Sequence, residues 1–229
     1  MLIPIGDETP TRTTPWVNYI LIAANCGVFL YALYHGLSET WILKFGHRAV
    51  HHGGWTLLTS MFLHAGWLHL AGNMWFLWIT GDNVEDRLGH LGYLAFYLLA
   101  GVSASLAQDR FMQGSLQHIP SVGASGAIAA VMGAYLCLIP KGKIRLGCFV
   151  WLFPPIMLFS FALPAFVTIG FWFWEQSQAH LFQVVHGVTS PVGYAAHCAG
   201  FLFGAIWVML LALTGQVRCD WMSRRGRAD

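Results

Sequence analysis

Two residues in apolar, glycine-containing stretches could together carry out acyl transfer. Ser125 lies in the sequence Gly-Ala-Ser-Gly at 123–126, and only small or apolar residues follow it through Gly133. His197 begins the pattern His-x-x-Gly-x-x-x-Gly, which ends at Gly204. A serine hydroxyl becomes an effective nucleophile when a neutral imidazole accepts its proton. Each residue alone also fits a packing role, in which its side chain hydrogen-bonds to the helix backbone.

Two further polar residues could stabilise the negative charge that such a reaction develops. His69 and Asn73 are spaced i, i+4, which puts them on one face of a helix. Both can donate hydrogen bonds to a tetrahedral oxyanion, and the backbone N–H of Ser125 near a helix N-terminus could add a third. The same spacing also fits a polar clasp between two helices.

A metal site is the alternative that the histidines raise. Five histidines lie between residues 47 and 69, and His47 and His51 form an i, i+4 pair. However, no HExxH motif is present, and no cysteine or acid joins these histidines. We therefore predict no metal and no cofactor. The histidines concerned are His47, His51, His52, His64 and His69.

The composition indicates an integral membrane protein that lies in a lipid bilayer. Hydrophobic residues make up 56% of the chain and charged residues only 10%, against about 25% charged in soluble domains. A net charge of +2 gives no reason to expect a nucleic-acid partner. The five cysteines form no CxxC pair, and residues 1–16 do not have the pattern of a cleavable signal peptide.

Apolar runs of about 20 residues predict an all-α bundle of six transmembrane helices. The uncharged stretch 146–174 contains three prolines, so we expect an interfacial or kinked segment over 146–163, then a fifth span and an outer loop over 175–190. The predicted division is a tail over 1–15, a membrane domain over 16–215 and a basic tail over 216–229. The six runs are 16–34, 62–80, 91–107, 121–139, one from about 164, and 191–213.

The distribution of basic residues predicts that both termini are cytoplasmic. Spans two, four and six then all begin at the outer face, and His69, Asn73, Ser125 and His197 come to one depth in the membrane. The acids after span two lie at the opposite face, so we expect a Ser–His dyad rather than a triad. On this reading nine basic residues are inside, namely Arg12, Arg87, Lys141, Lys143, Arg145, Arg218, Arg224, Arg225 and Arg227, and three are outside, namely Lys44, Arg48 and Arg110.

These motifs, taken together and in this order, resemble the rhomboid intramembrane serine proteases. The matching stretches are HAGWLHLAGN at 64–73, GDNVEDRLG at 81–89, GASG at 123–126 and the glycine pattern at 197–204, with LPA and GFWFW at 163–165 and 170–174. The resemblance implies a six-helix fold that cleaves transmembrane segments of other membrane proteins, and a bacterial plasma membrane location. It also implies roles for individual residues: Ser125 as nucleophile, His197 as general base, His69, Asn73 and Ser125 in the oxyanion hole, Gly126, Gly200 and Gly204 in helix packing, and Glu85 and Arg87 in a structural motif.

The sequence departs from the family pattern at two positions. Trp55 is followed by Thr56 where many relatives have arginine, which removes one means of anchoring the first outer loop. Ala129 stands where some relatives place a tyrosine against the catalytic histidine, so the sequence does not identify what orients His197. The alternatives are a catalytically inactive rhomboid-like protein that binds membrane clients, and a small transporter, for which inverted repeats or charged spans would be expected.

Overall fold

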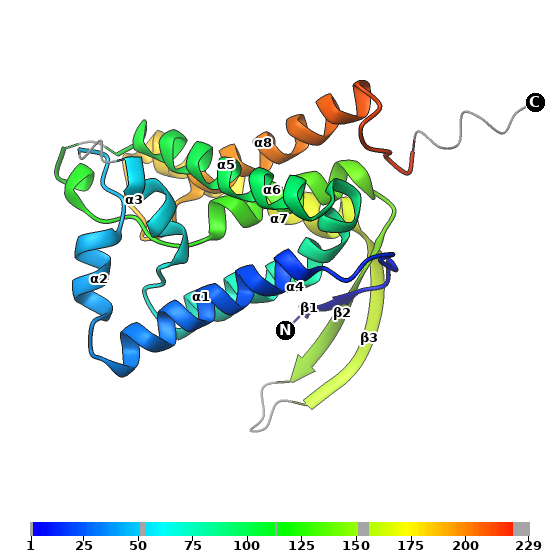
Figure 1. The fold of residues 1–229 in the computed structure, drawn as a ribbon, viewed down its shortest axis with the longest axis horizontal. Coiled ribbons are helices and arrows are strands. Elements are labelled where there is room, and N and C mark those ends of the chain that lie inside the picture. The colour runs from blue at the N-terminus through cyan, green and yellow to red at the C-terminus, as the bar shows by residue number, and fades with distance from the viewer. Residues whose placement is uncertain (1, 51–53, 113, 151–155, 222–229) are drawn as a thin grey trace, which may run out of the picture.

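The computed structural model describes residues 2–50, 54–112, 114–150 and 156–221 (Figure 1). Helices dominate, and a small sheet lies at one end of the bundle. The helices are α1 (Trp16–Tyr34), α2 (Ser38–Phe45), α3 (Gly54–Thr59), α4 (Trp67–Leu88), α5 (His90–Asp109), α6 (Ser125–Leu138), α7 (Ala165–His186) and α8 (Tyr194–Leu213), with short 3-10 helices at Ser60–Phe62 and Gly114–His118. The strands are β1 (Leu2–Asp7), β2 (Lys143–Val150) and β3 (Ile156–Pro164).

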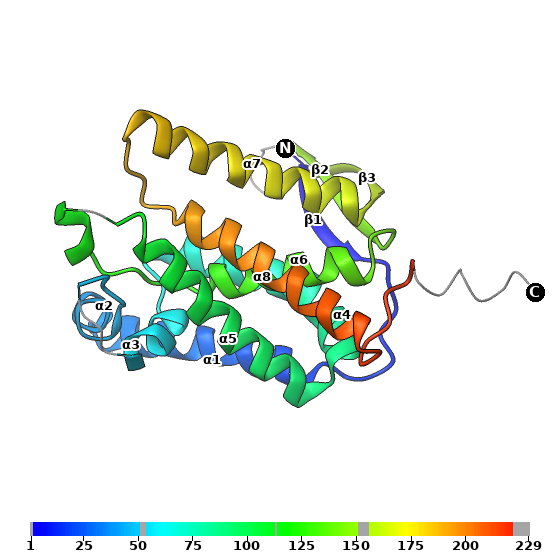
Figure 2. The same ribbon diagram turned by 90° about the horizontal axis from the view of Figure 1, so that it is seen from above.

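Helix α6 forms the centre of the bundle. It consists almost entirely of small and apolar residues, and every residue from Gly126 to Tyr135 is buried. A helix that is apolar on all sides must be covered on all sides, and α4, α5, α7 and α8 provide that cover. In Figure 2, α8 lies between α5 and α7, and α7 forms the outer edge of the bundle.

The helices identify an integral membrane protein. Within the described residues, α1, α5 and α8 are long and apolar enough to cross a bilayer, and α6 is a shorter apolar helix. Helices α4 and α7 have 22 residues each but also carry polar side chains. The count of six spans and the cytoplasmic termini stay predictions.

The three-stranded antiparallel sheet was not predicted, and the all-α expectation is wrong on this point. Strand β2 is central: Leu2 of β1 pairs with Cys148, and Leu163 of β3 pairs with Ile144. The described parts of the segment that was expected to be interfacial or kinked, residues 146–150 and 156–163, are therefore paired strands, and Pro154 and Pro155 lie outside the described residues. Strand β2 also pairs with the N-terminal strand β1. The positions of apolar runs cannot reveal pairing between segments so distant in sequence.

Two segments predicted to be loops are largely helical. Helix α7 continues to His186, so most of the expected outer loop 175–190 is helix. Residues 175–186 contain no proline or glycine, and Gly187, which has φ +63°, ends the helix in the left-handed conformation. The expected outer loop between α1 and span two contains α2 and α3.

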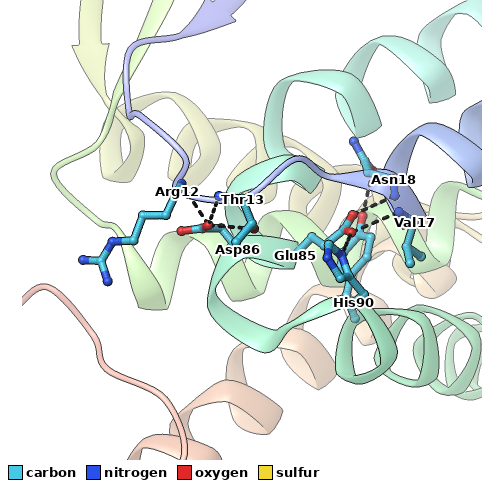
Figure 3. A network of polar contacts seen from close by, with 8 residues as sticks. Arg12, Thr13, Val17, Asn18, Glu85, Asp86 and His90 are labelled. Carbon is cyan, nitrogen blue, oxygen red and sulfur yellow. Dashed lines mark hydrogen bonds and ion pairs between the residues drawn. The ribbon is translucent and has the colours of Figure 1, made fainter.

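A buried carboxylate of α4 caps the start of α1 (Figure 3). No side chain of α1's own N-cap satisfies the free N–H groups of its first turn. Glu85, which is fully buried, accepts from the N–H groups of Val17 (3.0 Å) and Asn18 (2.7 Å). It also hydrogen-bonds with His90, and its negative charge suits the positive end of the α1 dipole.

The two residues after Glu85 hold the chain ends against the same end of the bundle. Asp86 accepts from the N–H groups of Arg12 and Thr13, each at 2.9 Å (Figure 3). Arg87 donates to the carbonyl of Arg218 (3.0 Å) and forms an ion pair with Asp220 (2.9 Å). The 85–87 segment thus connects α4 to the residues before α1 and after α8.

Candidate active site

Ser125 is the first residue of α6 and is half-buried. The chain reaches it through Gly123, whose φ of +122° favours glycine and whose N–H donates to the carbonyl of Ser60 (2.9 Å). No side chain caps α6. The N–H groups of its first turn therefore point to a place where a negatively charged oxygen would be stabilised.

Direct backbone contact between α6 and α8 brings Ser125 and His197 to the same place. A Cβ added at Gly200 would collide with the carbonyl oxygen of Gly126, and one added at Gly126 would lie 3.8 Å from the Cβ of Ala196. Ser125 directly precedes Gly126, and His197 directly follows Ala196. About one turn further along, a Cβ at Gly204 would collide with the carbonyl of Ala130, so the glycines set how closely the two helices approach.

The imidazole of His197 is held by residues of α7. Its Nδ1 lies 2.8 Å from Oε1 of Gln176, and the ring of Trp172 lies 5.9 Å away, centroid to centroid. An amide oxygen only accepts hydrogen bonds, so Nδ1 carries the proton and Nε2 keeps a lone pair. No hydrogen bond joins Ser125 to His197 among the described residues, and such bonds are often long before substrate binds.

His69 and Asn73 of α4 face the loop immediately before Ser125. A Cβ at Gly123 would lie 2.7 Å from Nε2 of His69 and 3.7 Å from Nδ2 of Asn73. Nδ1 of His69 accepts from the N–H of Ala65 (3.4 Å), which leaves the proton of the neutral ring on Nε2. Nδ2 of Asn73 is buried and has no hydrogen-bond partner in the part of the chain that the structure describes. Two donors therefore point toward Gly123.

A second histidine supports His69 from behind. His64 precedes α4, is 4% exposed, and packs edge-on against His69 with ring centroids 5.1 Å apart. Burial lowers the pKa of His64 to about 4, with a smaller contribution from His69. His64 is therefore neutral at physiological pH.

The histidines considered as metal ligands form no metal-binding group among the described residues. Across residues 2–50, 54–112, 114–150 and 156–221, no group of three or more His, Cys, Asp or Glu side chains could hold a metal ion. His51 and His52 lie outside the described residues.

His47 anchors the segment between α2 and α3 to the bundle beside the site. Its ring hydrogen-bonds with Asp109 at the end of α5 (2.9 Å) and with Thr56 (3.2 Å). Its backbone pairs in both directions with Ser121, four residues before Ser125, at 3.0 and 2.7 Å. A buried histidine therefore ties this segment to α5 and to the residues just before α6.

Gln176 and Trp172 are the site residues that the sequence analysis missed. They are spaced i, i+4 on α7, so they lie on one helix face. Gln176 falls in the segment that was predicted to be a loop, which concealed this spacing. A polar residue one turn after Trp172, just past the aromatic run 171–174, was the available signal.

The fold and site define a class: an integral membrane bundle in which a serine and a histidine lie on closely packed neighbouring helices, beside side chains that can donate hydrogen bonds. The family model described as "Rhomboid domain" matches residues 51–214. The chain belongs to the rhomboid family.

Similar proteins come from plants, mammals and bacteria. The chain is 32% identical to RHOMBOID-like protein 6, mitochondrial, of Arabidopsis thaliana over 154 residues (65% of the chain, 43% of that protein). It is 29% identical to human presenilin-associated rhomboid-like protein, mitochondrial, over 197 residues (82% and 46%). It is 44% identical to rhomboid protease GluP of Bacillus subtilis over 129 residues (53% and 24%).

These matches show how much of each relative the chain covers and where two of the relatives are located. The chain spans less than half the length of each of these three relatives. Two of the three are named as mitochondrial proteins. The comparisons therefore support a membrane location but not the expected bacterial plasma membrane.

Proposed function

We propose that this protein is an intramembrane serine endopeptidase that cleaves transmembrane segments of other membrane proteins through Ser125 and His197. The observation that carries the proposal is the α6–α8 contact, in which Gly126 and Gly200 touch and the serine and histidine adjoin them. Membership of the rhomboid family, with a relative named as a rhomboid protease, supports the same reading.

The chemistry follows from which atoms are free. Oγ of Ser125 attacks the scissile carbonyl carbon while Nε2 of His197 takes its proton. The oxyanion formed is stabilised by the N–H of Ser125 and by the donors of His69 and Asn73. When the tetrahedral intermediate collapses, His197 returns the proton to the leaving amine. Water then attacks the acyl-serine by the same route and releases the second product.

The position of the site matches a substrate from the bilayer. Ser125 starts the most buried helix of an apolar bundle, and α7, at the edge of that bundle, has many side chains exposed. A transmembrane helix offers no free carbonyl until it unwinds, so segments with small or helix-destabilising residues are the expected substrates. Orientation with the site near the outer face is part of this proposal.

The test is gel-based cleavage of a single-span model substrate by the purified protein in detergent. Ser125→Ala and His197→Ala should each reduce cleavage to background, a loss of about 10⁴-fold or more. Ser160→Ala makes the same chemical change in the sheet and should cleave like wild type. EDTA should have no effect.

Three results would contradict the proposal. Cleavage by Ser125→Ala at the wild-type rate would show that Ser125 is not the nucleophile. Loss of activity on addition of EDTA would indicate a metal-dependent mechanism, with the histidines as candidate ligands. Failure of the wild-type protein to cleave several single-span substrates would favour a client-binding role without catalysis.

A further inference from the structure

Gln176 makes the only hydrogen bond to the His197 ring that the described residues provide, at 2.8 Å from Nδ1. It is half-buried on α7, while its neighbour Glu175 is exposed. The surrounding α7–α8 contacts hold it in place: Phe173 stacks on Phe201 with ring centroids 4.1 Å apart, and Ser177 lies 3.8 Å from the sulfur of Cys198.

An acceptor at Nδ1 decides whether His197 can act as a base. Neutral imidazole carries one proton, which can lie on either nitrogen. With Nδ1–H bonded to the amide oxygen, the lone pair is on Nε2. After Nε2 takes the serine proton, the ring is a cation, and the bond to Gln176 becomes charge-assisted and stronger. The amide can thus orient the base and stabilise its protonated form.

The other groups around His197 do not offer this function. His69 of α4 interacts with it electrostatically but is itself a donor toward Gly123. Tyr194 contributes a ring edge 6.3 Å away, centroid to centroid. Within the ranges that the structure describes, no carboxylate is paired with His197.

We propose that Gln176 is the positioning residue of this site: its side-chain carbonyl holds His197 in the Nδ1–H tautomer, with Nε2 free for Ser125. This inference rests on the proposed protease function and extends it. A neutral amide on α7 takes the place that an acid occupies in a Ser–His–Asp triad.

The experiment compares three variants of the purified protein. Gln176→Met keeps the length of the side chain and removes the acceptor, Gln176→Glu keeps an acceptor, and Gln178→Met alters an exposed glutamine on the same helix. The readouts are kcat and KM on a single-span substrate as a function of pH, and the rate at which a small fluorophosphonate labels Ser125.

We expect the methionine variant to lose roughly 10- to 100-fold in kcat with KM unchanged, and labelling to fall by the same factor. The glutamate variant should stay within a few-fold of wild type. The low-pH limb of its activity profile should move to higher pH, because a carboxylate stabilises the protonated imidazole. Gln178→Met should match wild type.

A tautomer measurement tests the inference independently of activity. The ¹⁵N shifts of the His197 ring should show the Nδ1–H tautomer in wild type and a mixture in Gln176→Met. An unchanged tautomer, wild-type rates in Gln176→Met, or a glutamate variant as weak as the methionine variant would each overturn the inference. If one of these results is found and wild-type cleavage still depends on Ser125, the inference about Gln176 fails but the protease proposal holds. A wild-type protein with the expected tautomer but no cleavage would contradict the protease proposal alone.

Discussion

Helix α8 contacts α6 and α7 in two different ways. Toward α6 it presents Gly200 and Gly204, whose missing side chains let the two backbones touch. Toward α7 it presents His197 and Phe201, which meet Gln176 and aromatic rings. Helix α6 is buried for almost its whole length, whereas the only buried residues of α7 are Ala165 and Ile169.

This difference separates two requirements of the site. The distance between Ser125 and His197 depends on backbone contacts that cannot change without unpacking the bundle centre. The orientation of the His197 ring depends on a helix held mainly by side chains. Because few of its residues are buried, α7 should be displaced at lower cost than α6. If the proposed function holds, a substrate segment from the bilayer should enter most easily past α7.

The strongest test of the comparison places the same methyl group on both helix surfaces. Gly204→Ala would push a Cβ into the carbonyl of Ala130, whereas Gly170→Ala, on α7, would meet nothing within 4 Å. Overpacking costs about 1–3 kcal/mol, and alanine is about 1 kcal/mol better than glycine in a helix. We expect Gly204→Ala to lower the free energy of unfolding by about 2 kcal/mol and to impair cleavage, and Gly170→Ala to be neutral or stabilising.

Reversible unfolding in mixed micelles of mild detergent and SDS measures both changes. Gly27→Ala, on α1, is a second control because its added Cβ also meets open space. Equal effects of Gly204→Ala and Gly170→Ala would show that the α6–α8 contact is no tighter than the rest of the bundle.

The sequence predicted the elements that depend on local pattern. The first span was predicted at residues 16–34, and α1 has those bounds. The starts of α5 and α7 were predicted within one residue, because proline at 164 and apolar runs mark helix boundaries directly. The common location of Ser125, His69 and Asn73 followed from span direction alone.

What the sequence could not predict depends on contacts between distant segments. The sheet needs residues 2–7 to pair with 144–148, and no local period encodes that partner. Gln176 bonds with His197 only because α7 extends past Trp174 and is turned toward α8. A side chain that could equally face lipid or the bundle is assigned to a face only by the packed structure.

The stability of the protein should depend on pH through the buried His64, which packs against α4. His64 has a pKa of about 4 in the folded protein, against about 6.5 in an unfolded chain. The folded state binds fewer protons between these values, so stability is full above pH 6.5 and is lost as the pH falls toward 4. Between pH 7 and pH 5, protonation linked to His64 should lower the free energy of unfolding by about 2 kcal/mol.

Melting temperatures at pH 7 and pH 5 test this effect. His64→Gln should make this drop smaller than in wild type, since glutamine does not titrate. His186→Gln makes the same change at the exposed end of α7 and should leave the drop as it is. A drop that persists in full in His64→Gln would assign it to other groups.

The smallest effect is expected where α7 meets α8. Phe173→Ala removes the ring stacked on Phe201, and the stacking contributes about 1 kcal/mol beyond the apolar area that the ring buries. The area term is small here, because lipid or detergent tails can cover apolar surface that a side chain leaves. Phe166→Ala removes an exposed ring of the same helix and is the control. Hydrogen exchange in micelles should show faster exchange in residues 165–186 of Phe173→Ala, with 125–138 still protected. Catalysis should fall through kcat, because Gln176 no longer holds His197 in one orientation. Faster exchange spreading into α6, or destabilisation as large as in Gly204→Ala, would mean that α7 is as firmly integrated as the helix that carries Ser125. The base and the nucleophile would then be positioned by a single rigid unit, and the substrate would need another way in.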